Sequence, residues 1–134
     1  MKSMTCIAAA MALASILPVR ADDSTFVGQY SAAYQPCLQT AKAVRQIQHC
    51  NSEEIGRQQA AMSRAFQALL YARPGDRSRL QFDQDRWAEL MNTGCEEFSR
   101  RQGSLNSMKA QDCFRDSFMR RRLELEAALQ SRTR

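Results

Sequence analysis

The chain has 134 residues and a formal net charge of +5, with 19 basic and 14 acidic residues. The basic residues are dispersed along the sequence and form no stripe or tail of the kind that nucleic-acid-binding proteins carry. Charge therefore argues against a nucleic-acid partner, and no apolar segment is long enough to predict a membrane span.

The first 21 residues have the pattern of a secretory signal peptide. Lys2 supplies a positive start, residues 6–17 form a short apolar run, and residues 19–21 end in a small-residue cleavage pattern. The run is shorter than the roughly 20 residues that a membrane-spanning helix needs. We therefore predict a signal peptide over residues 1–21 and a single domain over residues 22–134. Because Lys2 and Arg20 would be removed, the mature net charge would be +3, and the protein would be periplasmic or secreted.

Four cysteines remain after the predicted cleavage, namely Cys37, Cys50, Cys95 and Cys113. An even number in a short exported chain indicates disulfides, because such proteins fold in an oxidising compartment. Structural zinc sites use cysteines roughly two to four residues apart, and these four are spaced more widely. We therefore predict two disulfides, with no metal and no cofactor.

Helical periodicity dominates the chain, and no alternating run predicts a strand. Residues 22–34 are expected to be a loose lead-in. Pro36 suits the first turn of a short helix, whose apolar side would carry Leu38, Ala41, Val44 and Ile47. The next helix is predicted to begin at Asn51 as its N-cap, with Glu54 completing a capping box, and to end at residues 73–75. Its apolar stripe consists of Ile55, Met62, Phe66, Leu69 and Leu70.

Asp76 suits the cap of a third helix. Its inward stripe is predicted to contain Leu80, Trp87, Leu90, Met91, Cys95 and Phe98. Phe82 falls off this stripe, and the residues expected to face outward are Gln84, Asp85, Arg86 and Glu89. Gly103 is a helix stop, and Ser104 is expected to cap a fourth helix. That helix would carry Met108, Cys113, Phe114, Phe118, Leu125 and Leu129 inward. The sequence thus predicts an all-α, disulfide-braced bundle of about four helices.

The spacing of the last two cysteines favours a disulfide between them. Cys95 lies eight residues before Gly103 and Cys113 ten residues after it. In an antiparallel hairpin they would stand roughly 12 and 15 Å from the turn, which is nearly level. Bridged Cα atoms lie about 4.4–6.8 Å apart, and Gly94 was expected to let the two backbones approach.

The first two cysteines can pair only if the chain folds back between them. In one unbroken helix Cys37 and Cys50 would be about 20 Å apart, which is too far for a disulfide. A short helix followed by a turn would bring them together. Pairing between the two halves of the chain remains an alternative.

The motifs that carry a family resemblance follow one another in a characteristic order. They are a cysteine pair followed by acidic residues, a Gln-x-x-Trp segment followed by a cysteine, and a Gly-Ser turn followed by a cysteine, an arginine and Glu-Leu. They read Cys37, Cys50 and Glu53-Glu54, then Gln84, Trp87 and Cys95, then Gly103-Ser104, Cys113, Arg121 and Glu124-Leu125. Over residues 37–129 the chain resembles the LprI-like lysozyme-inhibitor domain, a family of bacterial exported helical proteins. The resemblance implies a non-enzymatic protein, with Gln84, Trp87, Gly103 and Arg121 as residues of its structural motif.

No group of residues has the pattern of a catalytic site. His49 is the single histidine, and its neighbour Cys50 is expected in a disulfide, which argues against a thiol–imidazole nucleophile. Glu53 and Glu54 are adjacent, so their side chains leave a helix in different directions and do not suit a glycosidase pair. Trp87 is expected in the core.

The function that we predict is binding to a protein partner. The leading hypothesis, which the family resemblance implies, is inhibition of a lysozyme-type muramidase, and we expect a loop, residues 73–79 or 101–107, to occlude its cleft. Lysozymes are usually basic, so a net charge of +3 would slow the encounter. The alternative is a non-enzymatic interaction or structural module of the cell envelope with another protein partner.

Arg121 is expected to pair with Glu124 on a solvated surface.

Overall fold

The computed structural model describes residues 28–131, and the predicted signal peptide lies outside them. Four α-helices occur in this range, α2 (Tyr34–Thr40), α3 (Val44–Ala72), α4 (Arg77–Ser99) and α5 (Ser104–Gln130). A short 3-10 helix, η1 (Pro74–Asp76), joins α3 to α4. Residues 28–131 contain no strand, and the predicted all-α fold is confirmed.

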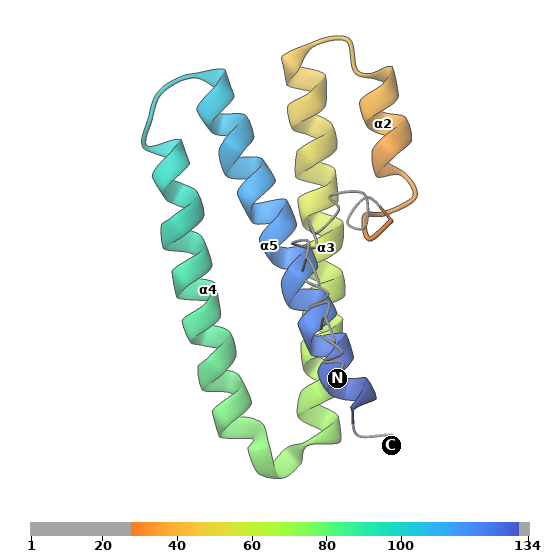
Figure 1. Cartoon of the computed structure of the whole chain (residues 1–134), viewed down its shortest axis with the longest axis vertical. Coiled ribbons are helices and arrows are strands. Elements are labelled where there is room, and N and C mark those ends of the chain that lie inside the picture. Colours follow the sequence, from red (N-terminus) through yellow and green to blue (C-terminus); the bar gives the residue numbers. More distant parts are fainter. Residues whose placement is uncertain (1–27, 132–134) are drawn as a thin grey trace, which may run out of the picture.

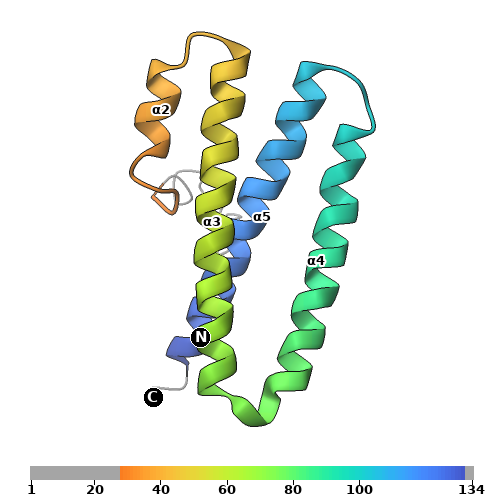
Figure 2. The ribbon, with the colours of Figure 1, turned by 180° about the vertical axis from the view of Figure 1, so that it is seen from behind.

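Consecutive helices run antiparallel, so α3 and α5, which pack on each other, run in the same direction (Figure 1). Figure 1 and Figure 2 show α5 crossing α3 at an angle, α4 standing on the outer side of α5, and α2 folded back beside the start of α3. The long turn before α5 and the short turn before α4 lie at opposite ends of α4 (Figure 1).

The hydrophobic core lies mainly between α3 and α5. Its buried members are Met62, Ala65, Phe66, Leu69, Leu70, Phe118 and Leu125. From α4 the core receives only the partly buried side chains of Leu80, Trp87 and Met91. Because each fully buried large apolar side chain stabilises the fold by about 1.5–3 kcal/mol, most of this stabilisation joins α3 to α5.

The start of α3 differs from the prediction. The helix begins at Val44, and Asn51 lies inside it and not at its N-cap. The side-chain oxygen of Gln46 accepts hydrogen bonds from the backbone N–H groups of Lys42, at 2.6 Å, and Ala43, at 3.2 Å, which satisfies two donors at the helix start. The turn between α2 and α3 therefore comes earlier than the Asn51 signal indicated, and Val44 belongs to α3.

The inward stripe of α4 is narrower than predicted. Leu90 is 64% exposed and Phe98 is 38% exposed, so neither is a core residue. Gln84, predicted to face outward, is buried. The reason is that α4 packs mainly on one helix, α5, so it has a single narrow contact strip in place of a broad apolar face.

Gly103 separates α4 from α5 and has a φ of +118°, a backbone conformation that favours glycine. It occupies the N-cap position of α5, and Ser104, the predicted cap, is the first helical residue. At the other end of α4, Pro74 opens η1, where a proline is tolerated because the first residues of a helix have no N–H partner.

Two disulfides brace the helices. Cys37 and Cys50 join α2 to α3 with a Cα–Cα distance of 5.8 Å, and Cys95 and Cys113 join α4 to α5 with 5.5 Å. The Cys95–Cys113 pair is the one that the sequence favoured, and the Cys37–Cys50 pair forms because the chain folds back between α2 and α3. A Cβ atom added to Gly94 would meet no atom within 4 Å, so the close approach at Cys95 does not require that glycine.

None of the helices within residues 28–131 combines the length and apolar character needed to cross a membrane.

Candidate functional site

Three of the four motif residues meet between α4 and α5. The Arg121 Nε donates a hydrogen bond to Gln84 Oε1 at 3.0 Å, and its guanidinium lies 5.6 Å from the centre of the Trp87 ring. Trp87 in turn packs edge-on against Phe118, with ring centroids 5.8 Å apart. Arg121 also pairs with Glu124 at 3.0 Å, as expected. The fourth motif residue, Gly103, lies apart from this cluster in the turn before α5.

A second polar cluster surrounds Arg115, which the sequence did not single out. Its side chain is 13% exposed and pairs with Asp112 at 2.8 Å and with Asp116 at 2.9 Å. The same guanidinium donates to the hydroxyl of Tyr34 and lies 5.0 Å from the centre of the Tyr30 ring. The sequence does contain a local signal for one contact of this cluster: Asp112 and Arg115 are three residues apart, a spacing that places them side by side on a helix.

The ionisation of this cluster follows from burial and charge. Burial, and then the hydrogen bond to Asp116, raises the pKa of Tyr30 to about 12. Burial also raises the pKa of Tyr34, against the opposing effect of the Arg115 charge. Burial is the largest effect on the pKa of Arg115 and acts to lower it, but the charge of Asp116 and the interactions with Tyr34 and Tyr30 together outweigh it, so the pKa is raised. Both phenols are therefore neutral at physiological pH.

Glu54 anchors the segment before α2 onto α3. Its carboxylate is completely buried and accepts hydrogen bonds from the backbone N–H of Ser31 at 2.8 Å, from the Ser31 hydroxyl, and from Gln58 Nε2 at 2.7 Å. Burial acts to raise the pKa of Glu54, but the hydrogen bonds from Gln58 and Ser31 outweigh it and lower the pKa. The predicted capping-box role of Glu54 is wrong, because it holds a distant segment and not the helix start.

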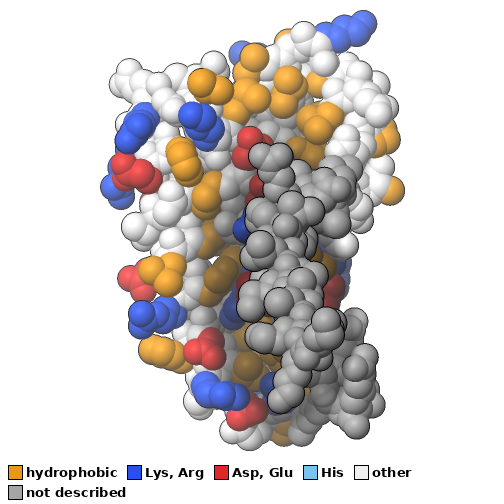
Figure 3. Space-filling view, in the orientation of Figure 1, with side chains coloured by type: hydrophobic (Ala, Val, Ile, Leu, Met, Phe, Trp, Pro, Cys, Tyr) orange, Lys and Arg blue, Asp and Glu red, His pale blue; other side chains and the backbone are white. Residues whose placement is uncertain are grey.

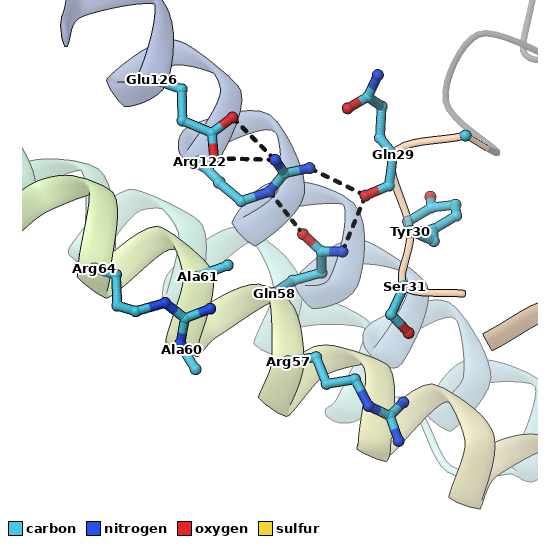
Figure 4. Close-up of a pocket in the computed structure, with 11 residues that line it drawn as sticks. Gln29, Tyr30, Ser31, Arg57, Gln58, Ala60, Ala61, Arg64, Arg122 and Glu126 are labelled. Atoms are coloured by element: carbon cyan, nitrogen blue, oxygen red, sulfur yellow. Dashed lines mark hydrogen bonds and ion pairs between the residues drawn. The ribbon is translucent and has the colours of Figure 1, made fainter. Parts of the chain in front are cut away.

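A pocket of about 550 Å³ lies beside this anchor, between residues 28–31, α3 and α5. Figure 4 shows Arg122 reaching across it from α5. Arg122 donates to Gln58 Oε1 at 3.1 Å and to the backbone oxygen of Gln29 at 3.0 Å, and it pairs with Glu126 at 3.0 Å. Its hydrogen-bonding groups are thus engaged in holding the segment at Gln29 against α3.

The opposite wall of the pocket comes from α3. Arg57 and Arg64 flank Ala60 and Ala61, and the two guanidinium groups line the same side in Figure 4. Arg57 pairs with Glu53 at 3.3 Å and with Glu54 at 3.5 Å, whereas Arg64 forms no ion pair with any described residue. The wall therefore suits an anionic group, and it offers no nucleophile or general base.

The residues considered for catalysis do not form a site. Cys50 is buried in its disulfide and His49 is exposed on the helix surface. Glu53 is 54% exposed while Glu54 is buried in its contacts with Ser31 and Gln58, and both carboxylates pair with Arg57, so they do not face each other across a cleft as a glycosidase pair does. Within residues 28–131 no three His, Cys, Asp or Glu side chains are grouped so that they could hold a metal ion.

These features define a class of protein: an α-helical scaffold, braced by two disulfides, in which polar clusters tie separate segments together. The chain belongs to the LprI lysozyme inhibitor family, whose model, described as "Lysozyme inhibitor LprI", matches residues 37–125, well over half of the chain. The matched range includes all four cysteines of the disulfides and the residues Gln84, Trp87, Gly103 and Arg121. No curated protein and no solved structure matches the chain. The disulfides and the family together indicate an extracytoplasmic protein.

Proposed function

We propose that the protein is a periplasmic or secreted inhibitor that binds a lysozyme-type muramidase and occludes its active cleft. The observation that carries the proposal is the family match over residues 37–125, because the family is described as lysozyme inhibitors. In this proposal residues 1–21 are a cleaved signal peptide, and residues 22–134 form a single domain that acts without a cofactor or catalytic residues.

The scaffold suits inhibition by a preformed surface. Two disulfides and the α3–α5 core hold the helices in one arrangement, so little conformational entropy is lost on binding. A stable protein–protein interface buries about 800 Å² on each partner, which the side of a bundle with helices of 23–29 residues can supply.

The two loops proposed to enter the cleft are the turns at the two ends of α4. In the first, Arg73 donates to the backbone oxygen of Ala128 at 2.8 Å and Arg79 pairs with Asp76 at 3.5 Å. In the second, Arg101 is exposed and pairs with no described residue, and Leu105 is 64% exposed. A glycosidase cleft contains two carboxylates, so an unpaired guanidinium such as that of Arg101 is the better complement.

An inhibition assay tests the proposal. The mature protein is added at micromolar concentration to several purified lysozymes acting on peptidoglycan, and the rate of hydrolysis is measured. We expect inhibition of at least one lysozyme, with a binding free energy of about −8 kcal/mol for micromolar affinity. No inhibition of any lysozyme, together with the capture of another envelope protein, would instead favour an interaction module of the cell envelope.

A further inference from the structure

The middle of α4 carries a charge opposite to that of the chain as a whole. Residues 83–97 contain five carboxylates and one arginine, whereas the whole chain has a net charge of +5. Among them, Asp83, Asp85, Glu89 and Glu96 form no ion pair with any residue in the range 28–131. The protein itself therefore leaves this negative charge uncompensated.

Two rows of side chains run along the side of α4 that faces away from α5. Phe82, Arg86 and Leu90 are four residues apart, so they follow one another along one row. Asp85 and Glu89 form a second row, and Phe82, Arg86 and these two carboxylates line a shallow depression of about 240 Å³. These five residues are called the α4 outer face below.

No described helix covers the α4 outer face. α4 packs on α5, and Phe82 and Leu90 are 63% and 64% exposed. Apolar and charged side chains lie interspersed along the α4 side of the molecule in Figure 3. The like charges of Asp85 and Glu89, one turn apart, destabilise a helix by about 0.2–0.5 kcal/mol. Within the described part of the chain, Asp85 and Glu89 form no ion pair that would offset this repulsion.

We propose that the α4 outer face is the surface that docks on the muramidase. Phe82 and Leu90 would supply its apolar contacts, and Asp85 and Glu89 would pair with basic side chains of the enzyme. The proposal rests on the proposed function and adds to it the contact surface. Because lysozymes are usually basic, a face on which two carboxylates outnumber one arginine provides local complementarity that the net charge of this chain lacks.

The position of this face agrees with occlusion by a turn. α4 has 23 residues and is therefore about 35 Å long, with both candidate turns at its ends. An enzyme bound along the α4 outer face would meet the Arg101 turn at one end or the Arg79 turn at the other. Docking and occlusion are thereby assigned to adjacent parts of one surface.

The test compares binding of the mature protein and its variants to a purified basic lysozyme, with dissociation constants and rates measured at low and physiological salt. One variant, D85N/E89Q, removes the two carboxylates and keeps their size. We expect about a tenfold higher Kd, mainly through slower association, and a weaker dependence of the association rate on salt. A second variant, F82A/L90A, removes the apolar contacts, and we expect at least a tenfold higher Kd through faster dissociation.

Matched controls change the same properties on another helix. E53Q also removes an exposed carboxylate, from α3, and V44A shortens an exposed apolar side chain at the start of α3. Both are expected to leave the Kd within about twofold of the wild-type value, and circular dichroism verifies that every variant is folded.

The binding measurements test the docking surface and the proposed function separately. Loss of affinity in both α4 variants but not in the controls supports the docking surface. Wild-type binding and inhibition that persist unchanged in D85N/E89Q and F82A/L90A would overturn the surface and leave the proposed function intact. A wild-type protein that neither binds nor inhibits the basic lysozyme would refute the occupant assigned to this surface, and failure with every lysozyme would refute the proposed function as well.

Discussion

The guanidinium of Arg121 stacks 5.6 Å from the centre of the Trp87 ring and donates to Gln84 at 3.0 Å. This contact attaches α4 to α5 about two helical turns beyond the Cys95–Cys113 disulfide, counted from the Gly103 turn. Because α4 contributes few fully buried residues, the cluster around Arg121 and the disulfide together determine how α4 is placed. The orientation of the α4 outer face depends on both.

Replacing Arg121 by Ala should destabilise the protein by about 1–3 kcal/mol. The change removes the stacking on Trp87 and leaves the buried oxygen of Gln84 without its donor. Urea unfolding of the purified protein measures the effect. The control is Arg45→Ala, an exposed arginine of α3 for which we expect a change below about 0.5 kcal/mol. Equal effects in both variants would contradict the bracing role of Arg121.

Glu54 should make the stability of the protein depend on acid pH. Its pKa in the folded state lies below the ordinary glutamate value of 4.5, so the unfolded chain binds the proton more readily. The stabilisation by Glu54 is therefore complete above a pH of about 4.5 and is lost as the pH falls through the folded pKa.

The variant Glu54→Gln tests this dependence by urea unfolding between pH 7 and pH 3. We expect it to be less stable than wild type near neutrality and to lose less stability in acid. Glu53→Gln, which changes the adjacent exposed carboxylate, is the matched control. A wild-type and a Glu54→Gln protein with the same slope of stability against pH would show that this carboxylate is not the acid-sensitive anchor.

The two disulfides should stabilise different parts of the molecule. Each closes a short loop, of 13 or 18 residues, so removing either by Cys→Ser replacement should cost about 3 kcal/mol. Loss of the Cys37–Cys50 disulfide should raise hydrogen exchange in α2 and in residues 28–33, which Ser31 and Glu54 hold against α3. Loss of the Cys95–Cys113 disulfide should raise exchange around the Gly103 turn. The same exchange pattern in both variants would contradict this division.

The elements of the fold were predictable because their signals are local. The stripe from Ile55 to Leu70, the break at Pro74 and the stop at Gly103 predicted three long helices, and the level positions of Cys95 and Cys113 predicted their disulfide. Hydrophobic periodicity and turn chemistry act over a few residues, so they could be recognised without knowledge of the tertiary structure.

The polar clusters could not be predicted, because they join segments far apart in the chain. Asn51 and Glu54 have the spacing of a capping box, and nothing local shows that Tyr34 and Ser31 would bind them instead. Leu90 follows the helical period of α4, yet it is exposed because no second helix packs there. Which face of α4 is covered depends on the placement of α3 and α5, which a local pattern does not contain.

Two glycines of the α4–α5 hairpin should respond oppositely to replacement by Ala. Gly94 lies inside α4, and an added Cβ would meet no atom within 4 Å, so Gly94→Ala should stabilise the protein by up to about 1 kcal/mol. Gly103 has a φ of +118°, which strains any residue with a Cβ, so Gly103→Ala should destabilise it by about 1–3 kcal/mol.

Thermal unfolding distinguishes these outcomes, since 1 kcal/mol shifts the Tm of a domain of about 100 residues by roughly 4–8 °C. The comparison also tests whether Gly94 is needed for the disulfide of its neighbour Cys95, which the open space around it argues against. A Gly94→Ala protein that unfolds at a lower temperature, or that exposes thiols at Cys95 and Cys113, would show that the glycine is required for the helices to approach.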